Sequence, residues 1–565
     1  MRPAGRGELD SLYFSYPDFE FRRPPEMDGS AGHHPVIVVG AGPVGMTAAL
    51  ELARRNVPCV VLDAKRTLND GSRAICISRS SFETLQQLGV VSAFEHKGLG
   101  WTHGRCYYRE RMIYRLEMPH SGHERYLPMY NLQQQYIEQF LVDAIDRQPE
   151  LIDIRWQSEA IGIREYDGGI EVIVRTPDGQ YVLRGDYLLA ADGARSMIRS
   201  LLGLRLDGEN LPGNYVIADV QMKHDFPTER RSYFESSANP DSTILVHRQP
   251  DDIWRIDWQL PEGQDPDEAI REDNVRARLQ AILDMIGHDA PWELEWWSIY
   301  TANTLCLDEY RHGRTIFIGD AAHIVPIFGV RGLNNGFADA VNAAWKLAYV
   351  LHGEGGDGLL DTYTAERRGA TLDVFLNAGK SSRFMTPPSR GFALMRKAAL
   401  QLSLSQEFTR RFADPRQVLP YTYSDSPLTS YPRRDLAFTG GVPAGGIAIN
   451  RKIAAGDFLL DHLGPGFTGL YFTTERKVTD AVVTLFSRLQ GMDHRFKPVV
   501  IAPAAMQQTA GDLVVDPAGA IFAAYAAQNT SFYLLRPDRH VAARWLNICP
   551  EEVDDALSTA LARNR

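Results

Sequence analysis

A glycine-rich turn between a strand and a helix constrains the fold of this 565-residue chain more than any other feature. The turn, Gly40-Ala-Gly-Pro-Val-Gly45, follows the β-branched run 35–40 and precedes residues 46–55, whose apolar positions recur at helical spacing. A second β-branched run at 59–62 completes a βαβ unit. This order of elements predicts an α/β fold with a parallel sheet.

The glycine spacing also predicts a ligand. Gly40 and Gly42 permit a tight turn and a close approach of the backbone to a pyrophosphate, Gly45 allows close helix packing, and the helix N-terminus attracts negative charge. Asp63 follows Gly45 by 18 residues, where its carboxylate is placed to accept a hydrogen bond from a ribose hydroxyl. We predict that a dinucleotide binds here. The motif does not decide between NAD and FAD. The alternative to a dinucleotide site is an ordinary tight turn that binds no ligand.

A second site is predicted where the strand 315–318 ends in Gly319-Asp320. The chain continues through Pro326 into the glycine-rich stretch 329–335, and a helix is predicted to start near Asn334. A carboxylate at a strand end can hold a ribityl hydroxyl, and a helix N-terminus can direct backbone N–H groups at the C2 carbonyl of a flavin. The alternative role for Asp320 is that of a helix cap.

A third loop, Asp192-Gly-Ala-Arg-Ser196, directly follows the predicted strand 187–191. Asp192 and Arg195 are candidates to hold pyrophosphate waters and a nicotinamide phosphate. The alternative is a surface turn with a helix cap and an exposed salt bridge.

Composition argues for a small-molecule ligand. The formal charge is −11 without a long basic block, which argues against a nucleic acid or an anionic membrane as the main partner. No apolar run approaches the roughly 18 residues that span a bilayer. The five scattered cysteines form no CxxC pair, so we expect neither disulfides nor a metal site. Free thiols suit a reducing compartment, and we expect a cytoplasmic location.

The three motifs, in this order and at this spacing, resemble those of the class A flavoprotein aromatic hydroxylases, the p-hydroxybenzoate hydroxylase superfamily. The segments 72–76, 247–257 and 328–336 are similar to its 3-(3-hydroxyphenyl)propionate hydroxylase-like branch. The resemblance covers roughly 35–380, with one departure at Ile327, where many relatives carry a second proline. The tail ending at 533–545 resembles the thioredoxin-like domain of longer members, and its single cysteine, Cys549, excludes a dithiol redox role.

The resemblance implies a Rossmann-like FAD-binding domain with an inserted β-sheet substrate domain and a C-terminal thioredoxin-like α/β domain. The expected boundaries are an N-terminal extension at 1–32, an FAD-binding domain at 33–205 and 301–400, a substrate sheet at 206–300, a helical linker at 401–440 and the thioredoxin-like domain at 441–565.

The resemblance also implies the residues that surround FAD. They are Gly40, Gly42, Pro43, Val44, Gly45, Asp63, Ala64, Arg73, Gln134, Asp192, Arg195, Gly319, Asp320, Pro326, Gly332, Leu333 and Asn334. The implied reaction is transient binding of NADH or NADPH in the FAD cleft, hydride transfer to the flavin, O2 addition to give a C4a-hydroperoxide, and hydroxylation of a small phenolic or catecholic ring. A homodimer is a further expectation from the family. A flavin-binding scaffold without turnover is the alternative, and a flavin halogenase is disfavoured because no WxWxIP segment occurs.

Three residues are candidates for catalysis. His247 or Tyr233, in the predicted substrate sheet, is placed to orient or deprotonate a phenol, although an unmatched histidine on a strand is more often a structural hydrogen-bonder. Arg331, in the flavin loop, is placed to add positive charge near the oxidant or simply to pair with a carboxylate. Strand alternation puts Leu245, His247 and Gln249 on one face, and Arg255, Asp257 and Gln259 on one face of the next strand; one set is expected to face the substrate.

Overall fold

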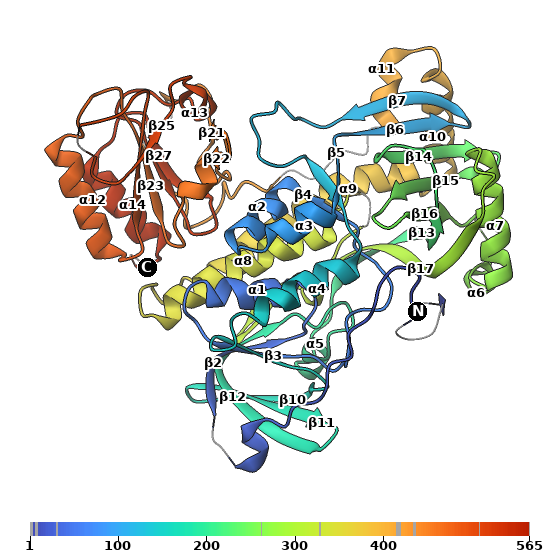
Figure 1. The fold of residues 1–565 in the computed structure, drawn as a ribbon, viewed down its shortest axis with the longest axis horizontal. Coiled ribbons are helices and arrows are strands. Elements are labelled where there is room, and N and C mark those ends of the chain that lie inside the picture. The colour runs from blue at the N-terminus through green and yellow to red at the C-terminus, as the bar shows by residue number, and fades with distance from the viewer. Residues whose placement is uncertain are drawn as a thin grey trace.

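The computed structural model describes residues 4–5, 10–29, 32–261, 263–326, 329–413, 420–432, 435, 437–507 and 509–563 (Figure 1). Two large sheets lie on the same side of a red C-terminal domain, which stands apart at the left of the view. Within the described residues, no helix combines the length and apolar character required to cross a bilayer.

The first sheet carries the predicted βαβ unit. Its parallel strands are β2 (His33–Val39), β3 (Cys59–Leu62), β9 (Ile152–Arg155), β19 (Thr315–Phe317) and the second half of β12 (Gly179–Ala190). The antiparallel strands β10 (Glu159–Tyr166) and β11 (Gly169–Thr176) extend it beside β12. Helices α1 (Pro43–Ala53), α4 (Gln134–Ile145) and α8 (Gly332–Leu351) pack near its parallel strands. The apolar runs 36–39, 59–62 and 315–317 of these strands are buried, as their unbroken apolar character predicts.

The second sheet is larger than the segment 206–300 from which it was predicted. Its strands β13 (Asp207–Met222), β14 (Arg230–Ser236), β15 (Asn239–Arg248), β16 (Ile253–Gln259) and β17 (Trp292–Cys306) come from that region. Two strands from earlier in the chain, β6 (His103–Tyr108) and β7 (Arg111–Glu117), continue the sheet because β6 pairs in parallel with β14. Helix α7 (Glu272–Met285) covers one face with an apolar stripe.

The C-terminal domain contains a five-stranded sheet in the order β25-β24-β23-β26-β27. The strands are β23 (Thr468–Phe472), β24 (Lys497–Ala502), β25 (Asp512–Val515), β26 (Phe532–Leu535) and β27 (Val541–Trp545), with helices α12 (Asp480–Met492) and α14 (Pro550–Ala560) packed together. Its apolar core includes Trp345 and Tyr349 of α8, a helix whose other apolar residues pack in the core of the first sheet.

The segment between the domains is only partly helical. Helices α9 (Thr362–Met385) and α10 (Arg390–Leu402) come before this segment, and α11 (Glu407–Arg410) lies at its start. Residues 420–432, which were expected to belong to a helical linker, form turns and irregular backbone. Three prolines, Pro420, Pro427 and Pro432, account for this difference because proline removes a backbone donor and restricts the preceding residue to extended conformations.

Candidate functional site

The three predicted loops meet at one edge of the first sheet. Strand β12 pairs in parallel with β2 and with β19, so the loops that follow these strands leave the sheet at their shared carboxyl end. A Cβ atom built on Gly319 would lie 3.2 Å from Val44 Cγ1, which shows that the Gly319-Asp320 turn contacts the glycine loop. The two segments are far apart in sequence but lie together in the fold, as the flavoprotein interpretation requires.

The glycines of this loop have two roles: Gly40 and Gly45 allow close packing of the backbone, and Gly42 leaves space for a ligand. Gly40 has φ 109°, and an added Cβ would lie 2.4 Å from the carbonyl oxygen of Ala191. A Cβ on Gly45 would lie 2.0 Å from the carbonyl oxygen of Gly40. Gly42, the N-cap residue of α1 with Pro43 at the first helical position, has no atom within 4 Å of its added Cβ. Open space beside a helix N-terminus fits a pyrophosphate.

Asp63 holds the loop in place. Its Oδ2 accepts a hydrogen bond from the backbone N–H of Ala41 over 2.8 Å, and its Oδ1 accepts one from Lys65 over 2.9 Å. Each carboxylate oxygen can accept a second hydrogen bond, which leaves room for a ribose hydroxyl. Ala64 is exposed beside it.

Asp320 lies in a recess of the turn. Its side chain reaches open space, yet desolvation by the surrounding protein raises its pKa, while His323 and Arg73 act to lower it. Arg73 belongs to the segment 72–76. Gln134 fixes that segment, because its Oε1 accepts hydrogen bonds from the backbone N–H groups of Arg73 and Ala74, each over 3.3 Å.

Asp192 caps a helix with one carboxylate oxygen, and its other oxygen has no hydrogen-bond donor among the described residues. Asp192 Oδ2 accepts a hydrogen bond from Ile198 N over 3.0 Å, at the start of α5 (Met197–Leu201). Its Oδ1 is buried without a hydrogen-bond partner among the described residues. A buried orphan acceptor fits a bound polar ligand or water. Arg195 is exposed, and Arg199 joins this loop to the Asp320 turn by donating to Ala321 O over 3.0 Å.

The predicted flavin loop has an unusual backbone. Gly329 and Val330 have φ of 92° and 55°, a left-handed conformation that is rare for a β-branched residue. Helix α8 then begins at Gly332, and Leu333 is half-buried. Pro326 is buried, whereas Ile327 and Phe328 lie outside the described residues.

The side chain of Asn334 is committed to the protein. Its Oδ1 accepts a hydrogen bond from Ser78 N over 2.9 Å, and its Nδ2 donates to Val330 O over 2.6 Å. Asn334 therefore fastens α8 to the segment that follows Cys76. The free backbone N–H groups in the first turn of α8 remain the groups that can meet a flavin carbonyl.

A buried carboxylate behind the Asp320 turn was not identified from the sequence. Asp339 Oδ2 accepts hydrogen bonds from Gly319 N over 3.0 Å and from His323 Nε2 over 2.7 Å, and Oδ1 accepts one from Arg367 Nε over 2.6 Å. Burial acts to raise the pKa of Asp339, but Arg367 and His323 hold it below its ordinary value. The available signal was an isolated charged residue, because Asp339 and Lys346 are the two charged residues of the segment 332–351.

The C-terminal domain contributes to the same buried region. Arg536 Nη2 donates to Glu366 Oε2 over 2.9 Å, and Lys346 Nζ donates to the same oxygen over 2.8 Å. Asp538 Oδ2 accepts hydrogen bonds from Asn342 and from the indole of Trp345, both over 3.2 Å. Two charged residues of the last domain thus complete an ion network on α8 and α9.

The second sheet presents a buried polar face. Strand pairing places four side chains in one row across it, in the order Arg230, His247, Arg255 and Asp219. Arg255 forms a two-point ion pair with Asp219 and donates a hydrogen bond to the carbonyl oxygen of Arg73 over 3.2 Å. This face therefore contacts the segment 72–76, whose Arg73 lowers the pKa of Asp320.

The two sets of side chains that were predicted on neighbouring strands, 245–249 and 255–259, lie on the same face of the sheet. Leu245 lies opposite Asp257, and His247 lies opposite Arg255, so both predicted sets point the same way. Several polar atoms on this face are buried without a hydrogen-bond partner among the described residues: His247 Nδ1, Gln249 Oε1 and Nε2, Arg230 Nε, Gln259 Oε1 and Tyr300 OH. So many orphan groups on one face indicate a chamber whose ligand completes their hydrogen bonds.

The structure separates the two predicted phenol-binding candidates. Tyr233 lies on the opposite face, stacked on Tyr107 at 4.6 Å between ring centroids, in the cluster that α7 covers. His247 lies on the polar face, and burial together with Arg230 and Arg255 holds its pKa well below the ordinary value. His247 is therefore neutral at physiological pH.

Arg331 is buried at the N-terminus of α8. Burial lowers its pKa, and the carboxylate of Asp373 on α9 opposes that effect.

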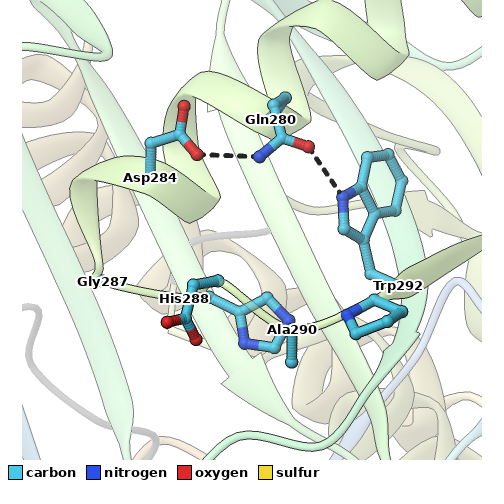
Figure 2. Close-up of a pocket in the computed structure, with 8 residues that line it drawn as sticks. Gln280, Asp284, Gly287, His288, Ala290 and Trp292 are labelled. Carbon is cyan, nitrogen blue, oxygen red and sulfur yellow. Dashed lines mark hydrogen bonds between the residues drawn. The ribbon is translucent and has the colours of Figure 1, made fainter.

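A separate surface depression lies between the end of α7 and the start of β17 (Figure 2). Gln280 links its walls by donating to Asp284 over 2.7 Å and accepting from the indole of Trp292 over 3.0 Å. None of its lining residues belongs to the predicted site, and it lies beside the helix that covers the opposite face of the sheet.

Comparisons with known proteins agree with this architecture. The sequence profile of a family described as FAD binding domain matches residues 33–377. A 3-(3-hydroxy-phenyl)propionate/3-hydroxycinnamic acid hydroxylase from Mycolicibacterium smegmatis is 27% identical over 91% of this chain and 91% of its own length. Its namesake from Escherichia coli K12 is 25% identical over 92% of this chain and 93% of its own.

Solved structures share the fold. The flavin-dependent monooxygenase PieE, in complex with FAD and substrate, has a TM-score of 0.76 at 22% identity and covers 94% of this chain and 100% of its own. Aklavinone-11 hydroxylase with FAD and aklavinone has a TM-score of 0.74 at 22% identity, with the same coverage of 94% and 100%. At these identities the likeness establishes the fold, including the C-terminal domain.

Proposed function

We propose, from the fact that the chain belongs to the FAD binding domain family, that it is an FAD- and NAD(P)H-dependent monooxygenase that hydroxylates a small phenolic or catecholic ring. The hydroxylase names of relatives that align along nine-tenths of the chain support this proposal. FAD held at this edge would supply the redox chemistry, which is hydride transfer from NADH or NADPH and reaction with O2.

One observation carries the proposal. The edge of the first sheet that presents Gly42 and Asp320 faces a buried polar sheet surface, and Arg255 connects the two through the carbonyl oxygen of Arg73. A dinucleotide site beside a chamber of unsatisfied polar groups is the arrangement that an oxygenase needs to bring a ring to a flavin away from bulk water.

The residues of the cofactor edge have distinct roles in this proposal. The N-terminus of α1 at Gly42 binds the pyrophosphate, Asp63 a ribose and Asp320 the ribityl chain. The first turn of α8, at Gly332, directs N–H groups at the flavin ring, where fixed donors stabilise negative charge. The open oxygen of Asp192, with Arg195, serves the transient nicotinamide cofactor.

The residues of the chamber orient the substrate. Neutral His247 has an unpartnered Nδ1 on the polar face, and we assign it the positioning of the ring hydroxyl. Arg331 adds positive charge at the start of α8, near the reacting end of the flavin. Tyr233 has no role in this proposal because it faces α7.

We place the enzyme in the cytoplasm, since its four core cysteines are buried as free thiols and Cys549 is also unpaired. A homodimer is part of the proposal.

The test is direct. The purified protein should show the absorbance of bound flavin near 450 nm, and a panel of phenols, catechols and hydroxyaryl acids should stimulate NAD(P)H oxidation with coupled hydroxylated product. Colourless protein that FAD does not reconstitute, or NAD(P)H oxidation that no aromatic compound stimulates, would reject the proposal in favour of a binding scaffold.

A further inference from the structure

The N-terminal segment 10–24 is rich in aromatic residues and forms neither a helix nor a strand. It lies outside the residues that the FAD binding domain profile matches, which begin at residue 33. A terminal segment without regular backbone pairing keeps a fixed path only when other contacts anchor it. Residues 11–19, which we call the strap, have such anchors beside both large sheets.

The two ends of the strap are bound to different sheets. Ser11 Oγ and Leu12 N donate to the two carboxylate oxygens of Glu295, over 2.5 and 2.8 Å, and Glu295 is a buried residue of β17 in the second sheet. Phe19 stacks on Trp156, which directly follows β9 of the first sheet, at 4.2 Å between ring centroids. The strap therefore crosses from one sheet to the other.

Between these anchors the strap runs beside the loop 66–73. Phe19 N donates to Arg66 O over 2.7 Å, and Thr67 Oγ1 donates to Pro17 O over 2.5 Å. No residue of the loop belongs to a helix or strand, so the position of the loop depends on contacts of this kind.

Tyr16 makes the strap contact that lies closest in sequence to Arg73. Its hydroxyl accepts hydrogen bonds from Gly71 N over 3.4 Å and from Gln135 Nε2 over 2.9 Å. Burial raises the pKa of Tyr16 to about 12, so the hydroxyl stays neutral at physiological pH. A Cβ atom built on Gly71 would lie 2.0 Å from Trp296 Nε1, which shows that the indole of β17 also confines the loop.

The position of this loop decides where Arg73 lies. Arg73 follows Gly71 by two residues and acts to lower the pKa of Asp320, in the turn that is proposed to hold the ribityl chain. Its carbonyl oxygen accepts a hydrogen bond from Arg255 on the buried polar face, over 3.2 Å. A side chain that acts on a ligand must be held in place, because a displacement of about 1 Å is enough to weaken its effect.

We propose that the strap is a positioning element of the cofactor site, in which Tyr16 holds Gly71 and thereby keeps Arg73 in place for FAD. The inference rests on the proposed function and gives a role to residues outside the matched domain. Tyr16 acts through the loop and is a positioning residue. A loop that is already ordered loses less conformational freedom when its ligand binds, so the strap should raise the affinity for FAD.

Tyr16→Phe tests the proposal, because it keeps the ring that packs on Phe14 and removes only the hydroxyl. The buried N–H groups of Gly71 and Gln135 then lose their acceptor, and FAD affinity, measured by flavin fluorescence, should fall roughly 5- to 10-fold. Amide hydrogen exchange of the apoprotein should become faster in residues 66–74 and stay unchanged in α1, a readout that needs neither bound FAD nor turnover.

The control is Ser11→Ala, which removes a hydroxyl of the same strap at the Glu295 end. Because this site is separate from the loop, FAD affinity should stay within about twofold of the wild-type value. Wild-type exchange and FAD affinity in Tyr16→Phe would overturn the proposal. An equal loss of affinity in Ser11→Ala would also overturn it, since the strap would then act through general stability.

A shortened chain that begins at Arg22 gives a second test. It should bind FAD more weakly than Tyr16→Phe, and a synthetic peptide of residues 1–21 added in trans should restore the affinity; FAD binding as tight as in the full chain would contradict the proposal. If the melting temperature shows that the shortened chain does not fold, the exchange and affinity of Tyr16→Phe decide. A failed proposed function would instead appear as a wild-type protein that binds no FAD.

Discussion

The backbone N–H of Gly319 lies 3.0 Å from Oδ2 of Asp339, so a buried carboxylate on α8 fixes the turn that presents Asp320. The other oxygen of Asp339 binds Arg367, which donates through Nη1 to the hydroxyl of Tyr423 over 2.9 Å. The position of the turn that carries Asp320 is therefore set by the buried side chains behind it.

Asp339→Asn should weaken both the fold and FAD binding. The substitution leaves Arg367 buried with its negative partner removed, and breaking a buried ion pair in this way costs about 3–5 kcal/mol. We expect a lower free energy of unfolding in urea and roughly tenfold weaker FAD binding by flavin fluorescence. The control is Asp308→Asn, whose partnership with Arg368 lies at the surface and should change stability by less than about 1 kcal/mol. Equal effects of both variants would contradict the role of Asp339.

Gly42→Ala should separate ligand binding from folding. The added methyl meets no atom within 4 Å and Gly42 has φ −77°, so the melting temperature of the apoprotein should change little. The methyl would project toward the pyrophosphate, and FAD affinity should fall roughly tenfold or more. Gly45→Ala is the comparison: its Cβ would lie 2.0 Å from Gly40 O and should destabilise the fold itself. Unchanged FAD affinity in Gly42→Ala would place the cofactor elsewhere.

Asp257 predicts a pH dependence of stability. Burial raises its pKa to about 7, and Arg255 only partly opposes this. Between the ordinary value, 3.8, and about 7, the folded protein retains a proton that the unfolded chain has released, so this residue lowers stability as pH rises and the effect levels off above pH 7. Asp257→Asn should gain stability relative to wild type from pH 4 to pH 7.

Denaturant unfolding of the apoprotein at several pH values measures this difference. Asp273→Asn, an exposed substitution in the first turn of α7, should parallel the wild type. A constant gap between wild type and Asp257→Asn across this range would show that the carboxyl group titrates normally.

Arg255 should couple substrate to cofactor. Arg255→Met leaves Asp219 buried without its cation and releases the carbonyl oxygen of Arg73, so we expect reduced stability and more hydrogen peroxide per NAD(P)H consumed. Combining it with Asp219→Leu should recover stability, because removing both charges avoids an unpaired ion, but should not recover coupling. Peroxide yield and urea unfolding test the two effects separately; coupling as efficient as wild type in Arg255→Met would reject the link.

Local sequence patterns were sufficient to predict that the glycine loop and the Asp320 turn lie together. The apolar runs that became β2, β12 and β19 are each followed directly by a polar or glycine-rich loop, and parallel strands place such loops at one edge. Pattern alone could not show that β6 pairs with β14, because that contact joins segments about 125 residues apart. It also could not show which face of β14 meets α7, the face on which Tyr233 lies. The hydrogen bonds of Asp339 and Asn334 could not be predicted, because their partners Arg367 and Ser78 come from distant segments.

The ion network on α8 has a consequence for shortened versions of the protein. A chain ending before the C-terminal domain would leave Lys346 and Glu366 without Arg536, and Trp345 and Asn342 without Asp538. Helix α8 starts beside the loop that is proposed to contact the flavin, so a structural change at the other end of the helix should also affect the proposed cofactor site. Removal of the last 125 residues should therefore destabilise α8 and α9, and the C-terminal domain should not be separable without loss of stability in the rest of the protein.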